Sequence, residues 1–190
     1  MPTPAFLRNY AQILKAARQC LEQDLHMPAL ILVFTLIDSF AWAASEKADR
    51  NVRDRFEKWL LERVYPDNSL PCTPTELYAA RCGILHTLTS QADLNLRQGV
   101  RQVVYAWGPA KLVNLQKSIE VLNRADLVGL HINELLDAIK EGMAKTFEAA
   151  EVDAALSARL QEAASLHLTE MPSNSLDKLM VLHEAGRKLL

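Results

Sequence analysis

The sequence predicts a mainly α-helical protein: an antiparallel helical bundle with a possible small two-stranded β insertion. Its 190 residues are enough for one domain with a buried core, and only six of them are glycine. Along most of the chain, apolar residues recur at the three- and four-residue spacing of amphipathic helices. Residues 100–107 are instead rich in β-branched and aromatic side chains. We expect a short strand there, rather than a helical turn, with residues 127–132 as its partner.

The first two helices are predicted from an amphipathic stretch and from the most apolar run in the chain. Residues 4–26 place apolar side chains at helical spacing between charged ones. Residues 28–45 are almost entirely apolar, which is also typical of a membrane span. This run is shorter than the roughly 20 residues that a bilayer requires, and it contains Asp38. We therefore expect a buried bundle helix and no membrane span.

A third helix and a helix with a clear start signal follow. Residues 46–63 carry charges of alternating sign beside an apolar stripe, as in a helix with one solvated face. After a turn-rich connection, Thr73 and Glu76 match a capping box, and Pro74 occupies the first helical position. We expect this fourth helix to begin near Pro74 and to last until about Ser90.

The second half of the chain is predicted to continue with helices. One is marked by apolar spacing over residues 112–122, another follows the cap residue Asn133, and a third runs from about 152 to 168. Residues 170–175 read as a hinge before a terminal amphipathic helix. The predicted organisation is a single domain and a C-terminal arm: residues 1–169, with the bundle at 4–90 and an extension at 96–169, and residues 170–190.

Net charge and cysteine usage limit the function classes. The formal net charge is −2, so no overall basic excess marks a nucleic-acid binder. The three cysteines have neither paired spacing nor a metal-ligand pattern, which suits a reducing compartment. The first 19 residues lack the apolar run and cleavage site of a secretory signal. We therefore expect a cytoplasmic protein.

Two charged residues stand where core helices normally carry apolar ones. Arg81 falls within the apolar arc of the fourth helix, whose other members are Leu77, Tyr78, Ile84, Leu85 and Leu88. A guanidinium cannot shed its proton, so it needs a carboxylate, a phosphate or water. Asp38 is the lone acid of its apolar run and is either a water-exposed acid at a helix end or the partner of Arg81. The predicted pair would orient the guanidinium and leave part of it free for a phosphate.

His86 lies five residues after Arg81 and points about 140° away from it around the helix. We therefore expect that one copy of the helix cannot aim both groups at one atom. Beside His86, the small residues Ala79, Gly83 and Thr87 form a stripe that suits close packing. A second copy, related by a two-fold axis, would bring both histidines and both arginines into one cleft, so we expect a homodimer.

The spacing Arg81-Cys-Gly-Ile-Leu-His86, near the end of a small helical bundle, resembles the R-x4-H motif of the HEPN superfamily over about residues 5–90. Many members of that superfamily are similar to metal-independent ribonucleases that act as dimers. The resemblance implies a HEPN-like fold and a dimer that binds or cleaves RNA. It also implies that Arg81 and His86 form a composite catalytic site, with Asp38 as the orienting acid.

The sequence differs from the family pattern at two positions. Cys82 stands where catalytic members usually carry a polar residue, often asparagine. Leu88 stands where the members that a partner nucleotidyltransferase modifies carry a tyrosine, which argues against that toxin and antitoxin pairing.

A histidine and an arginine are sufficient to cleave RNA without a metal. Imidazole can take the proton from a 2′-hydroxyl or protonate the leaving 5′-oxygen. A guanidinium can neutralise the charge that builds on the phosphorane-like transition state. The alternative is a non-catalytic interaction or regulatory protein with an unknown protein partner, in which Arg81 and His86 are structural.

Further contacts to nucleic acid are predicted from local charge. Basic residues outnumber acidic ones between positions 78 and 118, and from this stretch we expect Arg97, Arg101 and Lys111 to bind RNA. The alternative is a set of solvated faces of uneven sign. The sequence has no Gly-rich phosphate loop, and its histidines are scattered without metal-ligand spacing. We therefore expect no cofactor and no metal.

Overall fold

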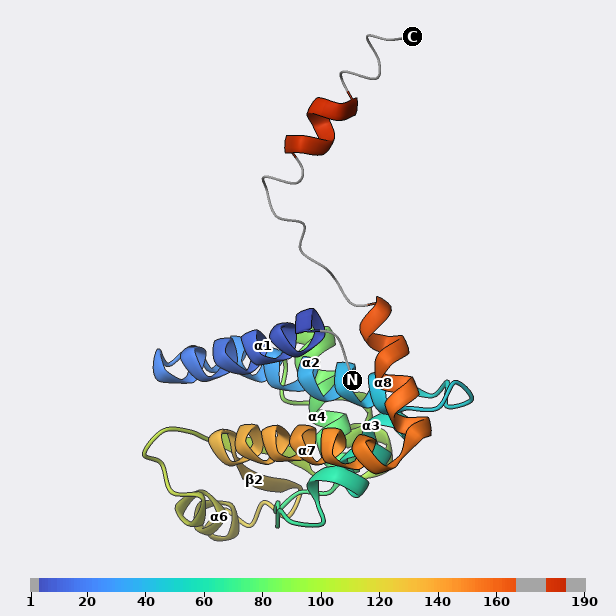
Figure 1. Ribbon diagram of the computed structural model, residues 1–190. Helices are drawn as coiled ribbons and strands as arrows, with labels where there is room; N and C mark the ends of the chain where they lie inside the picture. The colour runs from blue at the N-terminus through green and yellow to red at the C-terminus, as the bar shows by residue number, and fades with distance from the viewer. Residues whose placement is uncertain (1–3, 167–176, 184–190) are drawn as a thin grey trace.

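The computed structural model describes residues 4–166 and 177–183, and this part of the chain is mainly helical with a small parallel sheet (Figure 1). The predicted mainly helical class with a small two-stranded sheet is thereby confirmed. In chain order the elements are α1 (Pro4–Glu22), α2 (His26–Ala44), α3 (Val52–Trp59), η1 (Leu60–Val64), α4 (Pro74–Thr87), α5 (Asp93–Gln98), β1 (Gln102–Ala106), α6 (Leu112–Val121), β2 (Leu127–His131), α7 (Ile132–Val152) and α8 (Ala154–Leu166).

The apolar helix α2 lies at the centre of the fold and contacts α1, α3, α4, α7 and α8. Among the described helices, α2 is long and apolar enough to cross a membrane by length and composition, a test that core helices of soluble proteins also pass. Its fully buried side chains include Phe34, Ile37 and Phe40. The expected role of α2 as a buried bundle helix is confirmed.

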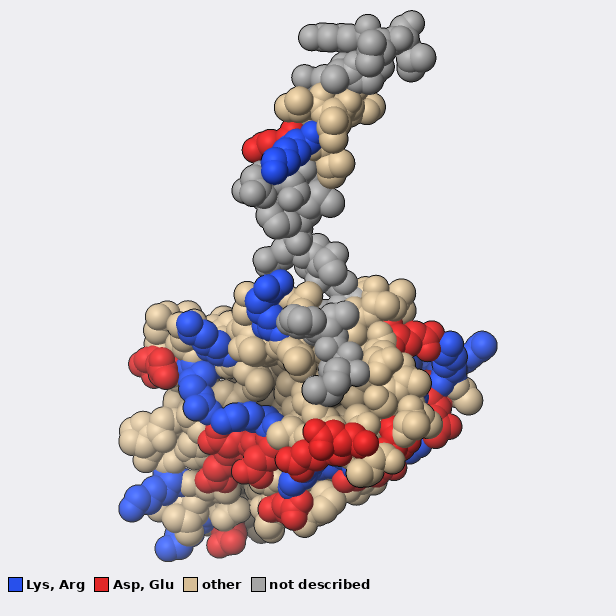
Figure 2. All heavy atoms as spheres, viewed as in Figure 1, with Lys and Arg blue, Asp and Glu red and all other residues tan. Residues whose placement is uncertain are grey.

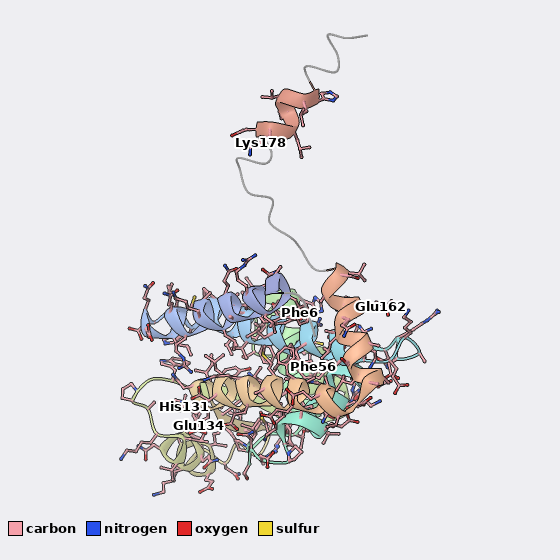
Figure 3. All side chains as sticks on the ribbon, in the orientation of Figure 1. Phe6, Phe56, His131, Glu134, Glu162 and Lys178 are labelled. Carbon is pink, nitrogen blue, oxygen red and sulfur yellow. The ribbon has the colours of Figure 1, made fainter. Side chains whose placement is uncertain are left out.

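Aromatic side chains hold α1 against α2. The rings of Tyr10 and Phe40 meet edge to face with their centroids 4.9 Å apart, and the Tyr10 hydroxyl lies 2.7 Å from the Ser39 hydroxyl. Burial raises the pKa of Tyr10 to about 12, and the hydrogen bond to Ser39 offsets part of that shift. Figure 3 shows Phe6 on α1 and Phe56 on α3, two fully buried side chains of the same core.

Helix α7 approaches the end of α3 closely at Gly142. The chain widens into a π-helical turn at η1, where the Tyr65 amide donates to the Leu60 carbonyl at 2.9 Å. A Cβ atom built on Gly142 would lie 2.6 Å from Cγ2 of Val64 and 3.3 Å from the Arg63 carbonyl oxygen. Glycine at this position therefore permits the contact between α7 and η1.

We expect Gly142→Ala to lower the free energy of unfolding by about 2 kcal/mol, because the new methyl group overlaps the β-branched Val64 side chain. In a helix without such a contact, the same change would stabilise by about 1 kcal/mol. Urea denaturation of the two proteins measures the difference. The double variant Gly142→Ala/Val64→Ala lacks the methyl group that would overlap the new side chain. Its loss of free energy of unfolding should therefore be smaller than the sum of the losses in the two single variants.

The two predicted strands form a parallel pair. Gln102 of β1 faces Leu127 of β2, and the register continues to Ala106 opposite His131. Parallel strands require a crossover connection, and α6 provides it. A Cβ atom on Gly129 would lie 3.1 Å from the Leu115 side chain, so α6 covers this face of β2 closely.

Several boundaries differ from the sequence predictions. The short helix α5 forms between α4 and β1, where no helix was predicted, and the capping residue of α7 is His131 rather than Asn133. Asn133 instead uses its Oδ1 atom to accept the Gly108 amide at 3.3 Å. Residues 177–183 are helical, as predicted, whereas the expected hinge at 170–175 lies outside the described residues.

Candidate functional site

Arg81 of α4 and Asp38 of α2 form the predicted ion pair. Oδ2 of Asp38 accepts a hydrogen bond from Nε of Arg81 at 2.7 Å, and Nη2 of Arg81 lies 2.6 Å from the same oxygen. The two side chains are only 14% and 20% exposed. Burial would lower the pKa of Arg81, but the hydrogen bond and the charge of Asp38 outweigh it and raise this pKa. The guanidinium is therefore a fixed cation at the contact of two core helices.

The start of α4 sets the position of this cation along the helix. The Glu76 amide donates to Oγ1 of Thr73 at 3.2 Å, and the Thr73 amide donates to Oε2 of Glu76 at 2.7 Å. The predicted capping box is thus present. The helix ends at Thr87, earlier than expected, because Leu88 takes a left-handed conformation with φ 54° and the chain reverses there.

His86 lies in the last turn of α4 and contacts Arg81 of the same chain. Nη1 of Arg81 is 3.0 Å from Nε2 of His86, whose side chain is exposed. The expectation that one copy of the helix cannot bring the two groups together is wrong. The long arginine side chain spans the angular separation that the two Cα positions impose.

The contact between Arg81 and His86 places a hydrogen-bond donor beside the imidazole. A guanidinium nitrogen can only donate a hydrogen bond, so Nε2 of His86 is the acceptor in this contact. A neutral imidazole with a lone pair on Nε2 is the form that can take a proton from a substrate.

The small-residue stripe of α4 is covered by the chain itself. A Cβ atom on Gly83 would lie 2.6 Å from the Thr89 carbonyl oxygen and 3.2 Å from the Gln91 carbonyl oxygen. The hydroxyl of Thr87 donates to the Gly83 carbonyl at 2.9 Å and lies 2.7 Å from the Thr89 hydroxyl. The expectation that a second copy packs on Gly83 is therefore corrected, because the segment after α4 folds back over it.

The sequence did not predict that the ring of Tyr78 lies near both Arg81 and Arg53. The ring centroid of Tyr78 is 5.8 Å from Cζ of Arg81 and 6.0 Å from Cζ of Arg53, which lies on α3. Burial raises the pKa of Tyr78, and the neighbouring Cys82 adds to this shift. The spacing of Tyr78 three residues before Arg81 could have indicated this contact, whereas no local signal places Arg53 there.

The structure describes the side chains of two of the three predicted RNA-contacting residues, Arg101 and Lys111. Arg101 binds Glu76 in a forked pair, with Nε to Oε1 at 2.5 Å and Nη2 to Oε2 at 3.1 Å. The carboxylate side chain is only 7% exposed, so this pair joins the start of β1 to α4. The Arg97 side chain lies outside the described part of the structure.

Lys111 is exposed and directly precedes α6. Four residues before it, the ring of Trp107 stacks on His26, the first residue of α2, with the centroids 3.9 Å apart. Asp38 lies about 18 Å further along that helix. Trp107 therefore contacts the end of α2 that is away from Asp38.

No group of three metal-ligating side chains comes together within residues 4–166 and 177–183. Comparisons of the chain with protein-family models, curated proteins and solved structures found no match. The resemblance to the HEPN superfamily consequently stays a prediction based on the spacing of Arg81 and His86. The chemistry of the site follows from its own groups: a fixed guanidinium beside an exposed imidazole.

Proposed function

We propose that this chain is a HEPN-like, homodimeric RNA-binding protein that cleaves RNA without a metal, with Arg81 and His86 as the composite site and Asp38 as the orienting acid. One observation carries the proposal: Nη1 of Arg81 lies 3.0 Å from Nε2 of an exposed histidine. Asp38 holds the other edge of the same guanidinium. A fixed cation and a proton acceptor thus share one position at the surface.

In the proposed reaction, His86 accepts the proton of an RNA 2′-hydroxyl through Nε2. The 2′-oxygen then forms a bond to phosphorus while the bond from phosphorus to the 5′-oxygen breaks. The leaving oxygen takes a proton from water, and the hydroxide that remains takes the proton from His86 and restores the free base. The products are a 2′,3′-cyclic phosphate and a 5′-hydroxyl. Arg81 donates through Nη1 to the phosphate, which replaces His86 as the acceptor, and stabilises the charge that develops in the transition state.

The charge distribution favours approach from the α4 side. Figure 2 shows a band of aspartate and glutamate over α7 on the face in view. Glu134, which Figure 3 labels near the start of α7, is one of the acidic residues of this helix. An acidic surface repels a phosphate backbone, so we propose that RNA contacts the exposed end of α4 at His86.

A second candidate is supported by the degree of burial. Every nitrogen of the Arg81 side chain already has a partner, and only 14% of that side chain is exposed. A satisfied, buried ion pair is also what a structural role requires. In this alternative the chain is a non-catalytic interaction or regulatory protein with an unidentified protein partner.

Incubating the purified protein with mixed RNA in EDTA distinguishes the two candidates. A metal-independent ribonuclease should release fragments that end in cyclic phosphate. No cleavage at any protein concentration would leave the interaction protein as the supported function.

The assembly and the compartment are part of the proposal. Arg81 and His86 meet within one chain, so their contact does not require a homodimer. The mass of the protein in solution, measured by light scattering, therefore tests the proposed homodimer independently of the site. We propose a cytoplasmic location because Cys20, Cys72 and Cys82 are all free thiols.

A further inference from the structure

We propose that Arg53 is a second phosphate-binding residue of this site and contacts a phosphate next to the one held at Arg81 on a single RNA strand. This inference rests on the RNA-binding function proposed above and extends it. Nothing in the local sequence of α3 distinguishes Arg53 from the other basic residues of that helix. The assignment comes from three observations: how Arg53 is anchored, which of its nitrogen atoms are free, and how close it lies to Arg81.

Arg53 is held at the base of its guanidinium. Its Nε atom donates to Oε1 of Glu57, one helical turn further on, at 2.8 Å. The hydrogen bond to Glu57 is the main cause that raises the pKa of Arg53. Asn51 caps α3 by accepting the Arg53 amide at 3.0 Å, so the backbone at this position is fixed as well.

The two terminal nitrogen atoms of Arg53 have no hydrogen-bond partner among the described residues, and the side chain is 32% exposed. Arg101 and Arg124 each place Nε and Nη2 on one carboxylate, that of Glu76 and that of Asp126, whereas Arg53 uses Nε alone. Two free, adjacent donors on a rigid fork match the oxygen atoms of a phosphate. Arg53 is therefore anchored on one side and open on the other.

The ring of Tyr78 connects Arg53 to the proposed catalytic residues. Both guanidinium carbons lie near this ring, 6.0 Å from its centroid for Arg53 and 5.8 Å for Arg81, so they are within about 12 Å of each other. Phe56 meets Tyr78 edge to face at 5.5 Å and keeps the ring in place. One short stretch of a single strand can therefore contact both cations.

The test measures how RNA binding depends on salt. A fluorescent single-stranded oligonucleotide with 2′-O-methyl groups binds but cannot be cleaved, because the attacking hydroxyl is blocked. The slope of log K against log salt is negative, and each lost phosphate contact makes it shallower by about 0.7 for a single strand. We expect Arg53→Gln to make the slope shallower by about this amount. Arg53→Lys should preserve the slope, because lysine keeps the charge.

Arg55→Gln is the matched control. Arg55 lies about 200° around α3 from Arg53 and donates to the Asp49 carbonyl at 3.3 Å, so its loss should leave the slope unchanged. Thermal unfolding of each variant confirms that it folds. If Arg53→Gln keeps the wild-type slope, or if Arg55→Gln changes the slope equally, the Arg53 contact is wrong. Either result leaves the proposed function of Arg81 and His86 standing. A wild-type protein that binds no oligonucleotide at any salt concentration overturns the proposed function and this contact together.

Discussion

Replacing His86 by alanine should lower the rate of RNA cleavage by about two to four orders of magnitude, the contribution typical of a general base. The physical reason is that Nε2 of His86 is an exposed proton acceptor beside the fixed guanidinium, at 3.0 Å from Nη1 of Arg81. The rate of formation of cyclic-phosphate ends in EDTA, at saturating protein, measures the effect.

A second substitution separates catalysis from structure at the same position. His86→Asn retains a hydrogen-bond acceptor for Arg81 but cannot take up a proton near neutral pH. The proposed mechanism predicts that His86→Asn is as inactive as His86→Ala while its unfolding midpoint stays close to that of the wild type. Cleavage at the wild-type rate by the asparagine variant would rule out His86 as the base.

Arg81→Ala should lower the free energy of unfolding by about 3 kcal/mol. It leaves a carboxylate that is 20% exposed without a cation, and Oδ1 of Asp38 already has no hydrogen-bond partner among the described residues. Removing one member of a buried ion pair is costly because the other charge stays desolvated. Urea denaturation followed by circular dichroism measures this loss.

The matched control is Arg18→Ala, which breaks the pair between Arg18 and Asp137. Those side chains are 52% and 60% exposed, so the loss should be under about 1 kcal/mol. In the Arg81→Ala background, Asp38→Asn should restore part of the stability, because a neutral amide is less costly to bury than an unpaired carboxylate. Equal losses in Arg81→Ala and Arg18→Ala would show that burial does not strengthen the Asp38 pair.

Local rules were sufficient for several features of this protein. The capping box at Thr73 and Glu76 involves neighbours in sequence, so residue type alone predicts it. The pair of Asp38 and Arg81 spans 43 positions, yet it could be predicted because each charge stands alone on an apolar face and needs compensation. The same reasoning identified α2 as a core helix.

Other predictions failed where side-chain reach or chain path decides the outcome. Helical angles place His86 and Arg81 apart, but the flexible arginine closes the gap. Charge counting did not predict that the guanidinium of Arg101 forks onto the buried Glu76, and its contact with RNA stays a prediction. A stripe of small residues predicts close packing at Gly83, but it does not tell whether a second copy or the returning chain fills the space.

The sequence by itself determined the helical class, the paired strands, the central apolar helix and the ion pair of Asp38 with Arg81. These features follow from periodicity, capping and the cost of burying a charge, all of which can be read from residue types. Only the tertiary structure decided that His86 meets Arg81 within one chain and that Arg53 shares the ring of Tyr78. Those contacts depend on rotamers and on how α3 packs against α4, and no short-range pattern in the sequence encodes either.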